Sequence, residues 1–276
     1  MGNALVAAVI ALVSVLPTPL VPAPVVRDTA GLRLDVARIV AASGAQIGVS
    51  LVELSGDTPV SWSYNGDQQF VAASTYKLPL LMANAQLVAA GAAHDSDPIC
   101  YSDWMWEDGW YSDYTDGACY TRLELAARIA QHSDNTAAHM LVASLGGSQA
   151  LNSYAARHGA AESAFYDPNL TTANDLARLL VDLASGRAGG GAAQQWLYPL
   201  LTHTSFESGI PAGVQANATV VHKVGMLDSV VNDAAIVLNG PRGAYVLTVM
   251  TDGPGGDAGW ALVAQVSGVV WRFELS

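Results

Sequence analysis

The chain has 276 residues, a formal net charge of −12, 51% hydrophobic residues and only 13% charged residues. The high apolar content excludes an intrinsically disordered protein, and the excess of 24 acidic over 12 basic residues argues against nucleic-acid binding. Two cysteines are too few for a disulfide scaffold, so a soluble globular enzyme or binding domain remains.

Residues 1–30 are interpreted as an apolar leader followed by a Pro-rich linker. Residues 4–16 carry no charged side chain, and prolines follow at Pro17, Pro19, Pro22 and Pro24. The apolar run is shorter than the ~20 residues of a membrane span and fits a secretory signal, but it lacks the usual basic start. An uncleaved anchor or a misassigned start is the alternative. We expect a secreted or periplasmic, cell-envelope protein with no stable membrane span in its mature form, and a disulfide between Cys100 and Cys119.

The rest of the chain, residues 31–276, is predicted to form one domain. Helical spacing at 31–43 is followed by two β-rich runs, 47–54 and 59–65, that predict a hairpin. A long apolar helix spans 76–90, and residues 94–120 are acidic and aromatic without periodicity. Further helices are predicted at 121–131, 134–145, 148–158, 172–184 and 192–202, then strands at 220–225, 233–240 and 244–253, and a last helix at 257–272. This order predicts an α/β fold with one antiparallel sheet, flanked by helices, and an all-helical lobe at about 66–216 inserted between its strands.

Ser74 and Lys77 are the first candidate catalytic pair. Ser74 lies where a non-helical segment gives way to a helix, and Lys77 follows three residues later, on the same helical face. A serine hydroxyl needs a base to become a nucleophile, and a lysine in apolar surroundings has its pKa lowered toward that role. On its own the pattern is weak, because a capping serine beside a solvated lysine gives the same letters.

Two further motifs support the pair. Ser133, Asp134 and Asn135 lie at the seam between two predicted helices, where simple N-capping is the alternative explanation. Lys223, Val224 and Gly225 lie on a late strand, where a glycine lets a substrate approach the backbone closely.

With these motifs in this order, the chain resembles the penicillin-recognising serine hydrolases, and most closely the class A β-lactamases. The matching segments are ASTYK (73–77), HSDNTAAHML (132–141), TTANDLARLL (171–180), and HKVG (222–225) followed by NDAAIV (232–237). The resemblance implies the β-lactamase/transpeptidase-like fold and a secreted serine hydrolase that opens β-lactam rings through an acyl-enzyme. The natural substrate would be a β-lactam or a peptidoglycan-like peptide or ester, and we expect a monomer.

The resemblance also implies a role for each motif residue. Ser74 would be the acylated nucleophile, Lys77 its proton acceptor, and Ser133 the donor of a proton to the leaving nitrogen. Asn135 would hold the substrate amide and Lys223 its carboxylate. The N–H groups of Ser74 and Met226, beside Gly225, would form the oxyanion hole.

The chain departs from the family pattern at two places. Val224 stands where the family has a hydroxyl that binds the carboxylate; His222, Thr251 and Ser229 are candidates to replace it. The loop that carries the family's deacylating Glu is shortened, and Asp167, in Asp-Pro-Asn-Leu, is the candidate base in its place. The alternative is that this tetrapeptide is only a turn.

Two features of the chain leave alternatives open. The Trp-rich segment 101–120 is either an aromatic gate at the mouth of a cleft or a disulfide-pinned surface loop. No His spacing typical of a metal site occurs, so we expect neither metal nor cofactor.

Two alternative functions stay open. One is a penicillin-binding DD-peptidase or esterase relative with slow deacylation, and the other is a non-catalytic binding module of the same fold.

Overall fold

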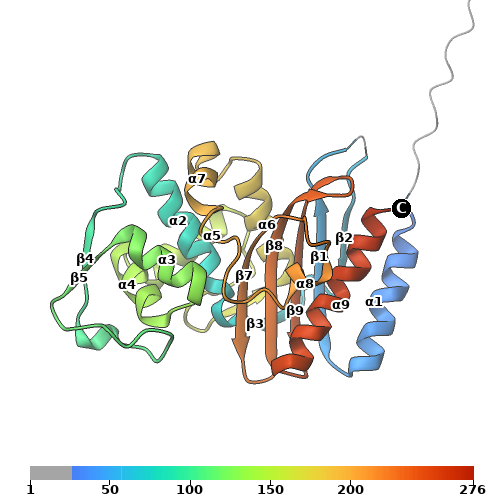
Figure 1. Ribbon diagram of the computed structural model, residues 1–276, viewed down its shortest axis with the longest axis horizontal. Coiled ribbons are helices and arrows are strands. Elements are labelled where there is room, and N and C mark those ends of the chain that lie inside the picture. The colour runs from blue at the N-terminus through green and yellow to red at the C-terminus, as the bar shows by residue number, and fades with distance from the viewer. Residues whose placement is uncertain (1–26, 57) are drawn as a thin grey trace, which may run out of the picture.

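The computed structural model describes residues 27–56 and 58–276, and residues 1–26 of the predicted leader lie outside this range. Five antiparallel strands form the main sheet in the order β2-β1-β9-β8-β7 (Figure 1). They are β1 (Gln46–Glu53), β2 (Ser61–Tyr64), β7 (Val220–Leu227), β8 (Val230–Gly240) and β9 (Gly243–Asp252). Because β1 pairs with β9, both ends of the chain contribute to one sheet, and the predicted fold class is confirmed.

Three helices cover one face of the sheet: α1 (Thr29–Ser43), α8 (Ile210–Gly213) and α9 (Gly256–Glu274) (Figure 1). Their apolar side chains and those of β1, β8 and β9 form one hydrophobic core. The strands β1 and β8 are buried along most of their length on both faces, which explains their nearly continuous apolar sequences. Helix α1 begins two residues before the predicted start because Asp28 caps it, accepting a hydrogen bond from the N–H of Gly31.

The second core lies between the other face of the sheet and the helical lobe. The lobe contains α2 (Lys77–Ala89), α3 (Arg122–His132), α4 (Asn135–Leu145), α5 (Ser148–Arg157) and α7 (Gly190–Leu197). Helix α6 (Ala173–Ala184) packs directly on the sheet, where the hydroxyl of Thr248 donates to the carbonyl of Ala173 over 2.8 Å. Helix α7 ends at Leu197, five residues before the predicted end, because Pro199 prevents its continuation.

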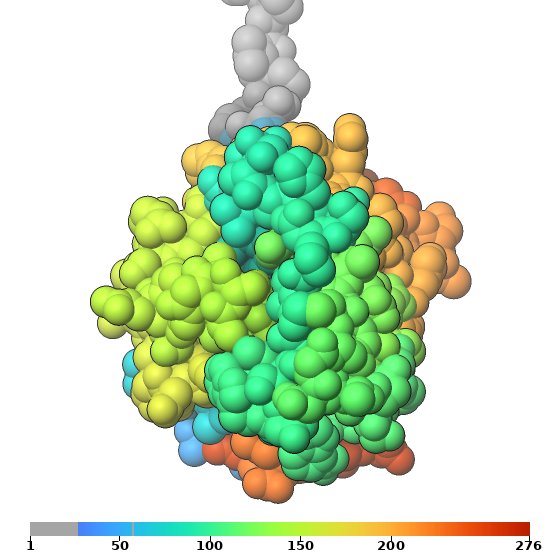
Figure 2. All heavy atoms as spheres, turned by 90° about the vertical axis from the view of Figure 1, so that its left-hand side faces the viewer, coloured from blue at the N-terminus to red at the C-terminus, as the bar shows by residue number. Residues whose placement is uncertain are grey.

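The aperiodic segment 94–120 runs over the end of the lobe farthest from the sheet (Figure 2). Its ends pair as two short strands, β4 (Pro98–Cys100) and β5 (Cys119–Thr121), and the predicted disulfide joins the directly opposed Cys100 and Cys119. A second short pair, β3 (Gln69–Val71) with β6 (Leu170–Thr172), brings the segment before Ser74 beside the segment after Asn169. Within residues 27–56 and 58–276, no helix is long and apolar enough to span a bilayer.

Candidate active site

Ser74 lies in a tight turn rather than at the start of an α-helix. Residues Ala73–Tyr76 form a 3₁₀ turn, and α2 begins only at Lys77. Ala73 has a left-handed backbone (φ 47°), a costly conformation for a non-glycine residue. Two side chains hold the turn: Asn169 Nδ2 donates to the carbonyl of Ala73 over 3.0 Å, and Asn232 Nδ2 donates to the carbonyl of Val71 over 2.9 Å. The nucleophile is therefore presented by a constrained segment.

Lys77 is fully buried and points at Ser74. Its Nζ donates to Ser74 Oγ over 3.0 Å, to the carbonyl of Ser133 over 2.6 Å and to Asn135 Oδ1 over 2.5 Å. Burial lowers the pKa of Lys77 to about 7, against the smaller opposing effects of Asp134 and Glu107. A substantial fraction of this amine is therefore neutral at physiological pH, and it lies within hydrogen-bond distance of the serine.

The Ser133–Asn135 motif forms the junction between α3 and α4. Ser133 ends α3 in a left-handed conformation (φ 58°), and the buried Asp134 caps α4, accepting from the N–H of Ala137 over 2.8 Å. Asp134 also accepts from the hydroxyl of Tyr114 over 2.6 Å. Helix capping and the candidate site therefore do not exclude each other, since the cap formed by Asp134 fixes the directions of Ser133 and Asn135.

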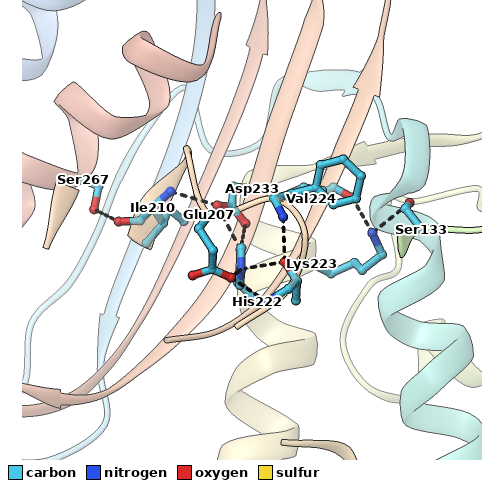
Figure 3. Close-up of polar contacts among 10 residues, drawn as sticks. Ser133, Glu207, Ile210, His222, Lys223, Val224, Asp233 and Ser267 are labelled. Carbon is cyan, nitrogen blue, oxygen red and sulfur yellow. Dashed lines mark hydrogen bonds and ion pairs between the residues drawn. The ribbon is translucent and has the colours of Figure 1, made fainter. Parts of the chain in front are cut away.

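Lys223 approaches Ser133 from the edge strand β7. Its Nζ donates to Ser133 Oγ over 3.0 Å and to the carbonyl of Val224 over 3.0 Å (Figure 3). Lys77 Nζ lies 3.4 Å from the same Ser133 Oγ, so both lysines converge on one hydroxyl. Burial and then the like charge of Lys77 hold the pKa of Lys223 well below its usual value.

Gly225 allows β7 to lie against the Ser74 turn. A Cβ at this position would lie 2.7 Å from the carbonyl oxygen of Ala72, 2.9 Å from the nitrogen of Thr75 and 3.0 Å from that of Ser74. The contact is with backbone, which cannot move aside without displacing the nucleophile. The sequence motif is thus explained by a close approach of two backbone segments.

Replacing Gly225 with alanine is expected to destabilise the protein by about 1–3 kcal/mol, the usual result of overpacking a rigid contact. The urea midpoint measures this loss. Gly191→Ala is the matched control, because a Cβ at Gly191 in α7 meets nothing within 4 Å. Equal midpoints for Gly225→Ala and the wild type would contradict the prediction.

A cavity of about 270 Å³ opens above Ser74. It is lined by Ala73, Ser74, Tyr76, Glu107, Asn135, Tyr166, Asn169, Met226 and Leu227. The structure thus brings Ser74, Asn135 and Met226 of the predicted site to one cavity, with Lys77, Ser133 and Lys223 joined to them by hydrogen bonds. Glu107, Tyr166 and Asn169 were not predicted: Glu107 lies in the aperiodic segment, Asn169 in the tetrapeptide interpreted as a turn, and Tyr166 directly before it.

Asp167 does not line this cavity. Ala164 and Leu170 exchange two backbone hydrogen bonds, of 2.9 and 2.8 Å, so the intervening residues form a short closed loop. Phe165 is buried in this loop, whereas Asp167 is exposed at its tip. Its role as a base stays a prediction, and its position outside the cavity does not support that role.

The three candidates to replace the hydroxyl missing at Val224 have other partners. Thr251 Oγ1 donates to the carbonyl of Val231 over 2.6 Å, and Ser229 Oγ donates to Asp252 Oδ1 over 2.7 Å. His222 is buried, with Nδ1 3.0 Å from Asp233 Oδ1 and Nε2 3.2 Å from Glu207 Oε1 (Figure 3). None of the three lines the cavity, so their positions do not support this replacement, which stays a prediction.

His222 is a buried cation held between two carboxylates. Burial opposes its protonation, but Asp233 and Glu207 outweigh burial and raise the pKa of His222 to about 9. Because the folded pKa exceeds the unfolded value of about 6.5, this group stabilises the fold fully below pH 6.5. That stabilisation decreases as the pH rises and is lost through pH 9.

We expect the free energy of unfolding to fall by on the order of 2 kcal/mol between pH 6.5 and 9.5 because of this residue. Urea denaturation across that range measures the fall, and His222→Gln, which cannot be protonated, should lose this component. Parallel pH curves for the two proteins would show that His222 is not charged in the folded state.

The tryptophans of the 101–120 segment lie on a surface loop and two of them contact histidines of the lobe; none lines the cavity, so the aromatic gate stays a prediction. Trp104, Trp106 and Trp110 are each more than half exposed. Trp110 stacks on His132 (ring centroids 4.9 Å apart), which precedes Ser133, and Trp104 meets His139 edge-on at 5.0 Å.

Within the described part of the chain, no group of three His, Cys, Asp or Glu side chains is placed to hold a metal ion.

Comparison with known proteins identifies the family. The sequence model of a family described as "Beta-lactamase enzyme family" matches residues 31–273. The chain is 27% identical over 246 residues to the β-lactamase Toho-2 of Escherichia coli, covering 81% of each protein. It is 28% identical over 237 residues to a β-lactamase of Citrobacter koseri, covering 78% of each.

Solved structures agree with this assignment. A structure of PBP-A superposes with a TM-score of 0.81 at 28% identity, covering 88% of this chain and 95% of PBP-A. An ancestral class A β-lactamase superposes with a TM-score of 0.78 at 28% identity, covering 87% of this chain and 99% of the other. The chain therefore belongs to the β-lactamase enzyme family, as a class A β-lactamase-like serine hydrolase.

Proposed function

We propose that the protein hydrolyses β-lactams through an acyl-enzyme on Ser74. The observation that carries this proposal is the continuous set of hydrogen bonds from Ser74 through Lys77 and Ser133 to Lys223. It joins a nucleophile, a base with a pKa of about 7, a hydroxyl and a second amine beside one cavity. These are the groups that acyl transfer requires.

The chemistry follows from the order of these groups. Neutral Lys77 accepts the proton of Ser74 as Oγ attacks the lactam carbonyl carbon, and the N–H groups of Ser74 and Met226 stabilise the developing oxyanion. As the C–N bond breaks, the hydroxyl of Ser133 gives its proton to the ring nitrogen and is reprotonated from Lys77. The second amide hydrogen of Asn135 is available to the substrate amide, because Nδ2 donates once, to the carbonyl of Asp108.

Lys223 binds the substrate carboxylate in this proposal. An anion placed against its Nζ would raise the pKa that burial and Lys77 lower, so substrate binding favours the charged form of Lys223. Because Val224 has no hydroxyl and faces Asp233 across the strand pair, the carboxylate loses one hydrogen bond that the family provides. We therefore expect weaker substrate binding, by about 1–3 kcal/mol, than a Thr at this position would give.

A penicillin-binding peptidase or esterase with slow deacylation is the second candidate. The exposed position of Asp167 favours it. So does the similarity to PBP-A, of which a single-residue mutant was solved as an acyl-enzyme complex with penicillin G. That structure superposes on this chain with a TM-score of 0.82 at 27% identity, covering 89% of this chain and 96% of the other.

Intact mass spectrometry after mixing with benzylpenicillin tests the proposal. A covalent adduct that forms and decays, with turnover of a chromogenic cephalosporin, is expected for a β-lactamase. An adduct that persists without turnover would assign the slow-deacylating relative instead. No adduct and no turnover would contradict both and favour a non-catalytic binding module.

We also propose export to a secreted or periplasmic location, as a monomer. The Cys100–Cys119 disulfide supports the proposed export, since such bonds persist in oxidising compartments. N-terminal sequencing of the protein recovered from culture medium and periplasm tests the proposal. Recovery from the cytosol with the leader intact would contradict it.

A further inference from the structure

Glu107 is a carboxylate in the Ser74 cavity that the acylation steps above do not use. It follows the short 3₁₀ turn Asp103–Met105 in the segment 94–120. Among the cavity-lining residues it is the only one with a carboxylate. The exposed Asp167 lies outside this set, so the two acidic residues are clearly distinguished by their positions.

The backbone of Glu107 is anchored to the helix that carries Asn135. The N–H of Glu107 donates to Thr136 Oγ1 over 3.0 Å, and the Thr136 hydroxyl donates back to the Glu107 carbonyl over 2.9 Å. Thr136 is fully buried and adjacent to Asn135 in α4. Asn135 Nδ2 in turn donates to the carbonyl of Asp108 over 2.6 Å. Glu107 therefore has a defined place relative to Ser74 and Lys77, although it belongs to a loop.

The carboxylate of Glu107 is contacted by Tyr166 and by His139, which lies in α4 one turn after Thr136. The hydroxyl of Tyr166 donates to Glu107 Oε1 over 2.8 Å, and His139 Nδ1 lies 3.1 Å from the same oxygen. This arrangement occupies Oε1 and leaves Oε2 available for a ligand in the cavity. The negative charge also reaches the catalytic pair, since it opposes the lowering of the Lys77 pKa.

Hydrolysis of a serine ester needs a group that takes a proton from water. The phenols of Tyr76 and Tyr166 line the cavity, but burial raises the pKa of both, so they remain protonated. Lys77 is fully buried and its Nζ has hydrogen-bond partners on Ser74, Ser133 and Asn135. Glu107 is partly exposed, carries a carboxylate and lines the same cavity as Ser74.

We propose that Glu107 is the general base that activates water to hydrolyse the Ser74 acyl ester. This inference rests on the proposed acylation of Ser74. The Glu107 carboxylate takes one proton from water as the water oxygen bonds to the acyl carbon. The bond between that carbon and Ser74 Oγ then breaks, Oγ regains a proton from Glu107, and the product leaves as a carboxylic acid. Tyr166 is a positioning residue, which orients the carboxylate through Oε1.

The test separates acylation from deacylation in Glu107→Gln, which preserves the size of the side chain. We expect the second-order rate of benzylpenicillin acylation, followed by intact mass, to change less than about threefold. Deacylation should slow by at least about 100-fold, the effect expected for losing a general base. In Glu107→Ala, added formate should raise the deacylation rate in proportion to its concentration, which a merely structural residue would not allow.

Asp108→Asn is the matched control, because it removes one charge from an exposed side chain outside the cavity lining and keeps the backbone carbonyl that Asn135 contacts. Its deacylation rate should equal that of the wild type. A Glu107→Gln adduct that decays as fast as the wild-type adduct would overturn the inference while leaving Ser74 acylation intact. So would a wild-type adduct as persistent as that of the variant, or stalling in Asp167→Asn alone. If wild-type protein gives neither an adduct nor turnover, the proposed function and this inference both fail.

Discussion

Replacing Ser74 with alanine is expected to reduce β-lactam turnover by at least about 10⁴-fold and to abolish the covalent adduct. Ser74 is the one hydroxyl that lines the cavity with a buried amine 3.0 Å away. Without it, Lys77 keeps its place but has no nucleophile to deprotonate. A chromogenic cephalosporin assay and intact mass after benzylpenicillin treatment measure the two effects.

Ser144→Ala is the appropriate control for this experiment. The Ser144 hydroxyl donates only to the carbonyl of Leu141, within α4 and away from the cavity. Its loss should leave turnover unchanged. An adduct that still forms in Ser74→Ala would mean that another group is acylated, and the assigned nucleophile would then be wrong.

The spacing of Ser74 and Lys77 predicted a contact that the structure contains, but through a different local geometry. A helical turn was expected, whereas a 3₁₀ turn precedes α2. Local sequence could not specify this, because the turn depends on Asn169 and Asn232, which are 95 and 158 residues from Ser74 in this numbering. The contact between the Ser74 and Lys77 side chains was therefore predictable, and the backbone conformation at Ser74 was not.

The long-range contacts of the site required the family resemblance. Periodicity placed Ser133 at a helix junction and Lys223 on a strand, but nothing in their spacing brings these residues within 3.0 Å of each other. The same limit explains why Glu107 was missed. It lies in a segment without periodicity, and it contacts Thr136 in α4 and Tyr166 in the loop before β6.

The long strands and the long helices were predictable, and the short elements were not. The strands of the main sheet are apolar runs bounded by turns, and the hairpin and the three late strands lie close to their predicted ranges. Helix α8 has only four residues, so it carries too short a pattern to be recognised. The short pair β3–β6 has three residues in each strand and is stabilised by tertiary contacts rather than by its own sequence.

The two lysines of the site are the only lysines in the chain, which makes their ionisation directly measurable. Protein labelled with ¹³C at lysine Cε should give two resonances, and Lys223→Arg assigns them. We expect the Lys77 resonance to titrate near pH 7, since burial lowers its pKa, instead of near the ordinary lysine value of about 10.4. A Lys77 resonance that titrates only above pH 10 would contradict the proposed base.

The same ionisation should control the rate at which Ser74 is acylated. Only the neutral amine of Lys77 can take the proton of Ser74, so acylation should fall about tenfold for each pH unit below 7. Lys77→Ala should slow acylation by about 10²–10⁴-fold and remove this dependence on pH. Stopped-flow measurement of acylation from pH 5 to 8 tests both effects. A wild-type rate that does not vary with pH, or a variant that keeps the wild-type profile, would assign the base to another group. Lys223 donates to the same Ser133 hydroxyl, and the charge of Lys77 helps to lower the pKa of Lys223, so the two amines act as one coupled pair.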